Sequence, residues 1–217
     1  MNPQLKVFVL PHPLIRHWLT VARDRYTPFP LFRTALQELS RWLTYEAIRD
    51  WLPTHEVEIE TPLAPTKGRI IHSQAPIGIV PILRAGLILL EPCQSLIPGA
   101  KVYHLGMMRD EHTLEPSCYL DRIPPTIAPE TRLIILEPML ATGGTMIYTM
   151  QTLTDRGADP KLMRVISIVC APPALQKLSP LYPELQIFAA AIDETLDDRG
   201  FIVPGLGDAG DRAFGTI

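Results

Sequence analysis

An acid and a glycine-rich turn follow a short apolar run in the stretch RLIILEPMLATGGTMIY, residues 132–148. The two glycines of Thr142-Gly143-Gly144-Thr145 let successive backbone N–H groups converge on one point. A helix that begins at such a turn adds partial positive charge, and the threonine hydroxyls add hydrogen-bond donors. The turn therefore predicts an anion site, although the same residues would also suit an ordinary strand-to-helix connection. It lacks the GxxxxGK[ST] pattern of a Walker A loop.

Glu137 lies between the apolar run and this turn. A carboxylate repels phosphate, so we expect it to face a different part of the same ligand. An ionised carboxylate only accepts hydrogen bonds, which suits the hydroxyl groups of a sugar. A phosphate beside vicinal hydroxyls indicates a ribose 5-phosphate group.

A second candidate anion site follows the apolar run PIGIVPIL at residues 76–83. Arg84 comes directly after this run and is followed by the small residues Ala85 and Gly86. Small residues let the backbone approach an anion, and the guanidinium group offers a planar fork of donors. The alternative is a surface arginine at the start of a helix.

The tail, residues 200–217, contains five of the chain's 13 glycines. Its alternative interpretation is a disordered tail. Apolar residues are interleaved with the glycines, however, and a solvated tail would rarely carry them. They are Phe201, Ile202, Val203, Leu206 and Phe214. A glycine-rich loop lined by apolar side chains suits a flat base that is read by backbone groups. Asp208, taken alone, would be a turn residue.

The elements that must position these residues alternate between strands and helices. Apolar periodicity predicts helices over 13–24 and from Pro30 to Pro53, the second with Phe32, Leu36, Leu39, Leu43 and Ala47 on one face. Short β-branched runs predict strands at 56–60, 76–83, 101–106, 132–136, 164–170 and 186–192. Helices are expected between them, at 85–96, 145–156 and 172–181, with Pro92 bending or ending the first. This order is typical of an α/β fold with a mainly parallel sheet, in which ligands bind at the carboxyl ends of the strands.

Composition limits the class of protein further. The 217 residues fit one domain, and the net charge of -3 argues against a nucleic-acid partner. No apolar run is long enough for a membrane span, so no membrane partner is expected. The three cysteines are odd in number and far apart, which predicts a reduced, cytoplasmic protein without a disulfide framework.

The pieces together resemble one family. The segment LEPMLATGGTMIY is similar to the signature for 5-phospho-α-D-ribose 1-diphosphate (PRPP) in type I phosphoribosyltransferases. Within it, PMLATGG resembles the version found in uracil phosphoribosyltransferases. HPLIRHWLTVARD and LTYEAIRD resemble the N-terminal helices of that family, and VPILRAGL resembles its diphosphate loop. GMMRDEHTLEP resembles its arm, and GFIVPGLGDAGDRAFGT resembles its uracil-binding segment. The resemblance covers nearly the whole chain.

The resemblance implies a type I phosphoribosyltransferase fold made of a single domain, residues 1–217. Its parts would be N-terminal helices (1–53), a protruding arm (107–125) and a C-terminal base-binding hood (193–217). It implies transfer of phosphoribosyl from PRPP to uracil, giving UMP and diphosphate. It also implies Mg²⁺ bound through PRPP and water without direct protein ligands, GTP as a candidate effector, and a homodimer or larger homo-oligomer.

The resemblance also assigns roles to residues. Arg84, Arg109 and Asp208 would be catalytic, with Arg109 closing over the diphosphate, although alone it would be a solvated loop charge. The residues expected to bind PRPP are Arg84, Arg109, Glu137, Pro138, Met139, Leu140, Ala141, Thr142, Gly143, Gly144, Thr145 and Asp208. Those expected at uracil are Ile202, Gly207, Asp208 and Ala209.

Two departures from the family pattern support alternatives. The family generally has Asp-Pro where this chain has Glu137-Pro138, and it tends to have glycine where this chain has Ile88. One alternative is therefore a catalytically weak homologue that binds PRPP or a nucleotide as a regulator. Another is transfer to a different base. The intact tail PGLGDAGDR argues against both.

Overall fold

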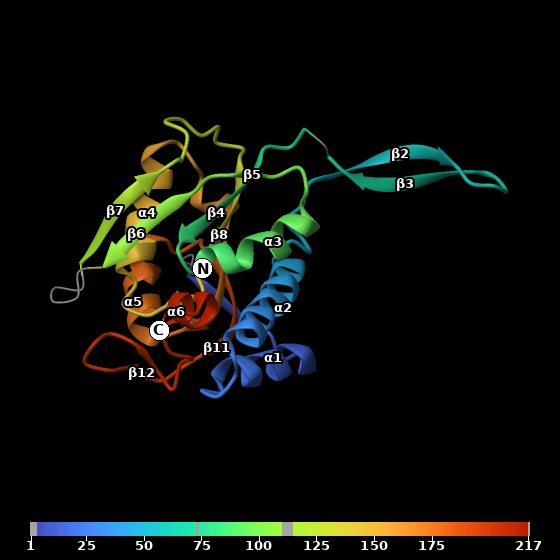
Figure 1. Ribbon diagram of the computed structural model, residues 1–217. Coiled ribbons are helices and arrows are strands. Elements are labelled where there is room, and N and C mark those ends of the chain that lie inside the picture. The colour runs from blue at the N-terminus through green and yellow to red at the C-terminus, as the bar shows by residue number, and fades with distance from the viewer. Residues whose placement is uncertain (1–3, 73, 110–114, 217) are drawn as a thin grey trace.

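A seven-strand path of β-strands forms the centre of the computed structural model, which describes residues 4–72, 74–109 and 115–216 (Figure 1). In spatial order the strands are β1 (Lys6–Val9), β11 (Gln186–Ile192), β10 (Met163–Cys170), β8 (Arg132–Leu136), β4 (Ile77–Leu83), β6 (Leu105–Arg109) and β7 (Pro116–Asp121). Two short strands extend the sheet, β5 (Lys101–Val102) beside β4 and β9 (Met139–Leu140) beside β10. Every neighbouring pair is parallel except the β6–β7 hairpin. The predicted mainly parallel sheet is confirmed.

Helices cover both faces of this sheet (Figure 1). They are α1 (Pro13–Arg23), α2 (Phe29–Ala47), α3 (Gly86–Leu96), α4 (Gly144–Asp155), α5 (Pro172–Leu181) and α6 (Ala209–Phe214). Alternate residues of β8 enter two separate hydrophobic cores: Ile134 packs in the core with α1, α2 and α3, and Ile135 packs in the core with α4 and α5. Both faces of the sheet are therefore buried, which explains why its strands read as continuous apolar runs. None of the described helices is both long and apolar enough to cross a membrane.

The predicted helix face in α2 is confirmed, because Phe32, Leu36, Leu39, Leu43 and Ala47 are all fully buried. The helix ends at Ala47, however, and does not run on to Pro53. After it the chain turns so that Trp51 packs into the core.

Pro92 was expected to bend or end α3, and it does not end it, because the helix continues through it to Leu96. Proline removes one backbone donor from a helix. Neighbouring hydroxyl groups supply hydrogen bonds at this point: Ser40 donates to the Leu89 carbonyl (2.8 Å) and Ser95 donates to the Pro92 carbonyl (2.8 Å).

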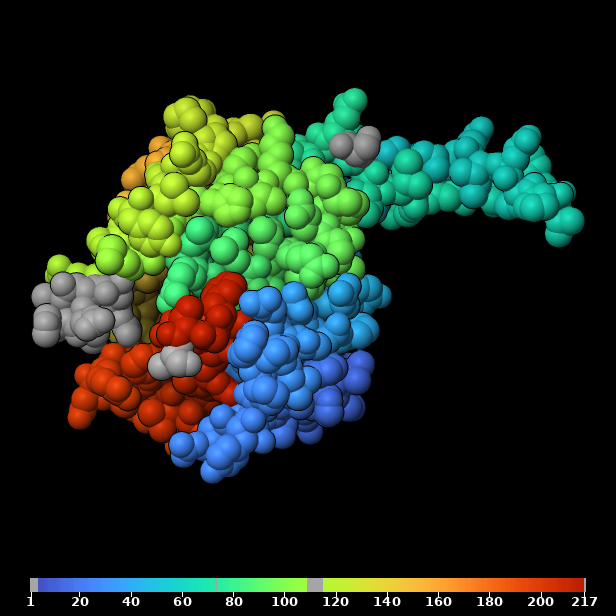
Figure 2. Space-filling view, in the orientation of Figure 1, coloured from blue at the N-terminus to red at the C-terminus, as the bar shows by residue number. Residues whose placement is uncertain are grey.

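A hairpin of β2 (Thr54–Glu60) and β3 (Pro65–Ile71) projects from the body of the molecule (Figures 1 and 2). The sequence predicted a strand within β2 but missed β3 and the projection. Where the sequence predicted an arm over 107–125, β6 and β7 pair antiparallel, and β6 also pairs with β4 at the edge of the main sheet.

The C-terminal residues 193–217, the hood, carry a two-stranded ribbon and a short helix. The ribbon pairs β12 (Thr195–Leu196) with β13 (Ile202–Val203), and α6 follows it. The sequence predicted a glycine-rich loop here and missed α6.

Candidate active site

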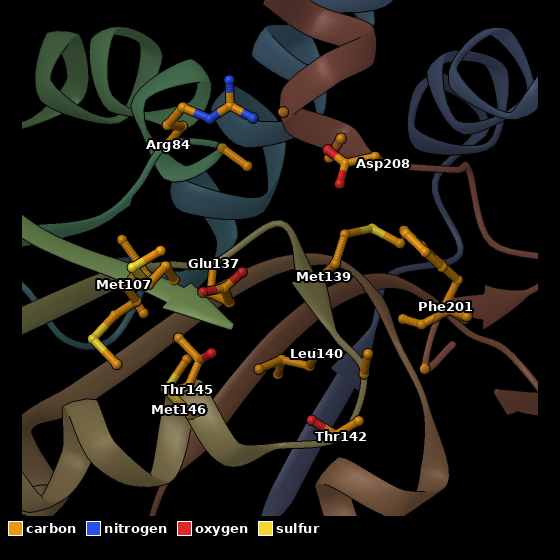
Figure 3. A pocket seen from close by; sticks show the side chains of 18 of the residues that line it. Arg84, Met107, Glu137, Met139, Leu140, Thr142, Thr145, Met146, Phe201 and Asp208 are labelled. Atoms are coloured by element: carbon orange, nitrogen blue, oxygen red, sulfur yellow. The ribbon is translucent and has the colours of Figure 1, made fainter. Parts of the chain in front are cut away.

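A cavity of about 980 Å³ opens where the main-sheet strands end, between the β6–β7 hairpin and the hood. In the view of Figure 3, Arg84 and Asp208 lie at one end of this cavity and Thr142 and Thr145 at the other, with Glu137 between them. Residues separated by more than a hundred positions in the sequence therefore line one cavity. It lies at the carboxyl ends of parallel strands, the edge at which the sequence predicted a ligand.

The predicted anion turn connects β9 to α4. Gly143 has a left-handed backbone conformation (φ +84°), which favours glycine, and a Cβ atom there would lie 3.0 Å from the Cα atom of Ala174. Helix α4 begins at Gly144, and its first backbone hydrogen bond runs from Ile147 N–H to the Gly143 carbonyl (2.9 Å). The N-terminus of α4 thus faces the cavity, as an anion site requires.

Most residues of the predicted PRPP segment line the cavity: Glu137, Met139, Leu140, Ala141, Thr142, Gly143 and Thr145. Pro138 and Gly144 do not line it. The Pro138 carbonyl accepts hydrogen bonds from the N–H groups of Ile168 (2.9 Å) and Val169 (3.1 Å), so it joins the segment to β10.

Glu137 follows the last residue of β8 and is half-buried. Its backbone N–H donates to the Ile166 carbonyl (3.1 Å), and its carboxyl group points into the cavity (Figure 3). Burial raises the pKa of this carboxyl group from 4.5 to about 8, against a smaller lowering by a backbone hydrogen bond from Met139. Burial therefore favours the protonated form of Glu137, whereas the sequence argument assumed an ionised carboxylate.

Arg84 lies directly after β4, where the sequence placed it, and lines the cavity. The peptide bond between Leu83 and Arg84 is cis. The guanidinium group donates to Asp211 in α6 at 2.8 Å, so the loop after β4 is joined to the hood. Arg109 is the last residue of β6, but its side chain lies outside the part of the structure that is described.

Asp208 caps the N-terminus of α6, where its Oδ1 atom accepts a hydrogen bond from Asp211 N–H at 2.9 Å. It also lines the cavity. The expected uracil residues Ile202, Gly207 and Ala209 line the same cavity from the hood.

Sequence reasoning missed several lining residues. Met107, Met108 and Tyr119 come from the β6–β7 hairpin, Arg199 and Phe201 come from the hood, and Asp211 holds Arg84. The three-residue spacing of Asp208 and Asp211 is a helix-capping pattern that could have indicated α6.

The fold and the position of this cavity define a class of protein. The structure of adenine phosphoribosyltransferase from Leishmania donovani superposes with a TM-score of 0.56 at 14% identity, over 89% of this chain and 85% of that one. The chain forms an α/β domain with a mainly parallel sheet and helices on both faces, and it superposes on this structure. It therefore has the type I phosphoribosyltransferase fold.

The family follows from closer similarities. A sequence model of uracil phosphoribosyltransferase matches residues 9–216. A uracil phosphoribosyltransferase from Synechococcus elongatus is 59% identical over 216 residues, which cover the whole of both chains. The AQ2163 protein from Aquifex aeolicus superposes with a TM-score of 0.87 at 36% identity, over 96% of this chain and 97% of that one. The chain belongs to the uracil phosphoribosyltransferase family, which confirms the resemblance and the expected class of enzyme.

Proposed function

We propose that this chain transfers the phosphoribosyl group of PRPP to uracil, giving UMP and diphosphate, a reaction of pyrimidine salvage. The observation that carries the proposal is the single cavity that joins an anion turn, a carboxyl group, an arginine and the hood (Figure 3). These are the groups needed for a phosphate, a ribose, a diphosphate and a base, in that order.

The 5-phosphate would bind at the turn from Thr142 to Thr145. The left-handed Gly143 and the N-terminus of α4 support this placement, because unpaired N–H groups and the helix dipole favour an anion there. Glu137, between the two ends of the cavity, would bind the ribose hydroxyl groups. A protonated carboxyl group can donate one hydrogen bond as well as accept others.

The diphosphate would leave at the end of the cavity occupied by Arg84 and Asp208. As the bond from ribose C1 to diphosphate breaks and the bond to uracil N1 forms, the N1 proton is released with the diphosphate product, and negative charge collects on the leaving group. The Arg84 guanidinium group already lies at that end and would stabilise this charge once the diphosphate shares it with Asp211 or takes the place of Asp211. Arg109, in the arm, would close over the diphosphate and exclude water.

Magnesium is proposed as the cofactor, and the carboxyl group of Asp208 offers hard oxygen atoms of the type it prefers. No cluster of three or more His, Cys, Asp or Glu residues within the described part of the chain could hold a metal ion. Magnesium would therefore be bound through diphosphate oxygens and water, with Asp208 contacting it through water. When bound, it would neutralise charge on the leaving diphosphate.

Uracil would lie against the backbone of Ile202, Gly207 and Ala209. This part of the cavity also weighs against the regulator alternative, because a sensor of PRPP alone would not need a surface for a base.

A homodimer or larger homo-oligomer is proposed as the assembly, with the β2–β3 hairpin contacting a second copy of the chain. An isolated two-stranded hairpin is marginally stable in water. The hairpin leaves Ile59, Leu63 and Ile70 exposed by 45%, 97% and 50%, and a second copy would cover them. Light scattering should give at least twice the chain mass of 24.3 kDa, and Leu63→Ser should lower it. A monomer mass for the unmodified chain, or an oligomer mass that Leu63→Ser leaves unchanged, would contradict this assembly.

The proposed reaction is tested by incubating the chain with uracil, PRPP and Mg²⁺ and measuring UMP. UMP should form, and removal of magnesium with a chelator should stop its formation. Binding of PRPP without any turnover would instead support the regulator alternative. GTP added to the same assay tests its role as an effector: an increased rate supports that role, and an unchanged rate contradicts it.

A cytoplasmic location stays a prediction from the cysteines, all three of which are free.

A further inference from the structure

A nearly buried ion pair holds the hood to the N-terminal helices. Asp193 follows β11 and is 6% exposed. Arg23, at the end of α1, donates to both of its carboxylate oxygens, from Nη2 to Oδ1 at 2.6 Å and from Nη1 to Oδ2 at 2.8 Å. Figure 2 shows the C-terminal segment lying directly against the N-terminal helices. Such a bidentate pair fixes orientation as well as distance.

The same ion pair binds the backbone of Gly205 on both sides. Gly205 N–H donates to Asp193 Oδ2 at 2.8 Å, and the Gly205 carbonyl accepts from Arg23 Nη1 at 3.0 Å. Gly205 has a φ of +56°, and a Cβ atom there would collide with the carbonyl oxygen of Ile202. Ile202, a cavity residue, therefore packs against a turn whose position is set by Arg23 and Asp193.

A second arginine holds the next residues of the turn. Arg212, in α6, donates from Nη1 to the Leu206 carbonyl at 2.7 Å, and Leu206 precedes the cavity residue Gly207. The same guanidinium group donates to the carbonyls of Ala22 and Asp24, each at 2.7 Å. It also lies over the ring of Phe32 in α2, 4.1 Å from the centroid.

Both arginines thus join the turn to the same place, the C-terminal end of α1. Arg23 belongs to α1 and reaches Gly205, whereas Arg212 belongs to the hood and reaches back to Ala22 and Asp24. The backbone between the cavity residues Ile202 and Gly207 is therefore held by hydrogen bonds at the two adjacent residues Gly205 and Leu206.

We propose that Arg23 and Arg212 are positioning residues that set the affinity and selectivity for the base. They act through the turn at Gly205 and Leu206 and do not themselves line the cavity. This inference rests on the proposed contact of uracil with the backbone of Ile202 and Gly207. Discrimination by hydrogen bonds requires donors and acceptors fixed to within about 0.5 Å. A looser turn would let the wrong base pair with displaced backbone groups.

The test uses Arg23→Lys and Arg212→Lys in the full-length chain, with Arg33→Lys as the matched control. Lysine keeps the charge but loses the planar fork that makes several hydrogen bonds at once. Arg33 also binds the hood, through the Ala213 carbonyl (3.1 Å from Nη2), but contacts neither Gly205 nor Leu206. All three variants therefore disturb the same interface, and only two of them disturb the turn.

The KM for uracil should rise about tenfold in Arg23→Lys and Arg212→Lys, while the KM for PRPP changes by less than about twofold. The ratio of kcat/KM for uracil to that for cytosine should fall about tenfold in both, because the turn no longer holds the backbone groups in place. Arg33→Lys should leave the KM for uracil and this ratio unchanged.

A folded Arg23→Lys variant with an unchanged KM for uracil and unchanged base selectivity would overturn the inference. So would an equal rise in the KM for uracil and for PRPP, which indicates a general structural role. The double variant Arg23→Gln/Asp193→Asn removes both charges and replaces Arg23→Lys if that variant does not fold. Failure of the proposed function is distinguishable, because the unmodified chain itself would then not turn over uracil.

Discussion

The Arg84 guanidinium group forms an ion pair with Asp211 at 2.8 Å, joining the loop after β4 to helix α6 of the hood. The hydroxyl of Thr216 donates to the same Asp211 oxygen at 2.6 Å. Hydrogen bonds from Thr216 and then Arg84 lower the pKa of Asp211, so its carboxyl group stays ionised at neutral pH. In the proposed reaction, the diphosphate would share Arg84 with Asp211 or displace it. The loop after β4 and the hood are thereby joined before any substrate binds.

Arg84→Gln should lower kcat/KM for PRPP by at least about tenfold, because the leaving group loses its charged partner. The KM for uracil should change much less, since Arg23 and Arg212 still hold the turn at Gly205 and Leu206. Steady-state kinetics with each substrate varied in turn measure both. Arg49→Gln is the control. Arg49 lies just beyond the end of α2 and pairs with Glu46, and neither residue lines the cavity. Equal losses of kcat/KM for PRPP in the two variants would show that Arg84 does not act at the site.

Asp208→Asn should reduce turnover by about a hundredfold while the melting temperature barely changes. Asparagine caps a helix as well as aspartate does, so the hydrogen bond to Asp211 N–H can persist when the charge is removed. Asp208→Ala removes the cap too and should cost about 1 kcal/mol of stability. Activity and thermal unfolding of both variants separate the two roles. An active Asp208→Asn variant would assign Asp208 to the cap alone.

The stability of the chain should depend on pH through Glu137. Its pKa is raised from 4.5 to about 8 in the folded protein, so the folded state holds a proton that the unfolded state has lost. The resulting stabilisation is fully present below pH 4.5 and disappears as the pH rises through about 8. Relative to Glu137→Gln, the free energy of unfolding should fall by up to about 1.4 kcal/mol per pH unit in that window. Denaturant unfolding at several pH values measures this, and parallel pH profiles would contradict it.

Glu137→Asp should lose activity or gain little, although aspartate is the residue that the family pattern favours. The glutamate carboxyl group lies one bond, about 1.5 Å, further from the backbone. It already points into the cavity, so shortening it should withdraw it from the ribose hydroxyl groups (Figure 3). Kinetics of both proteins at saturating magnesium decide the matter. A gain of about tenfold or more on shortening would show that Glu137 overshoots its ligand.

The sequence predicted the parts of the fold that are buried on both sides. The runs at 132–136 and 186–192 match β8 and β11, because a strand covered on both faces must be apolar throughout. The hairpin of β2 and β3 was missed in part because both strands are mostly exposed and show no burial pattern. Helix α6 has six residues, too few for helical periodicity to be visible.

The predictable parts of the site are those in which the residue types and their position after a strand already indicate the chemistry. The glycines of the anion turn and the position of Arg84 after a strand were visible in the sequence. The pairing of Arg84 with Asp211, and of Arg23 with Asp193, depends on contacts between distant segments. The raised pKa of Glu137 arises from burial, which a single sequence does not display.

The most direct test of the account is the turnover of the unmodified chain with PRPP and Mg²⁺ on uracil and on cytosine. Uracil offers an acceptor at O4 and a donor at N3, and cytosine reverses both. Backbone groups arranged for uracil would be left unpaired by cytosine, and a site of this kind can discriminate by about ten-thousand-fold. The account predicts UMP from uracil and hardly any product from cytosine. No turnover of uracil, or cytosine turnover within about tenfold of it, would contradict the account.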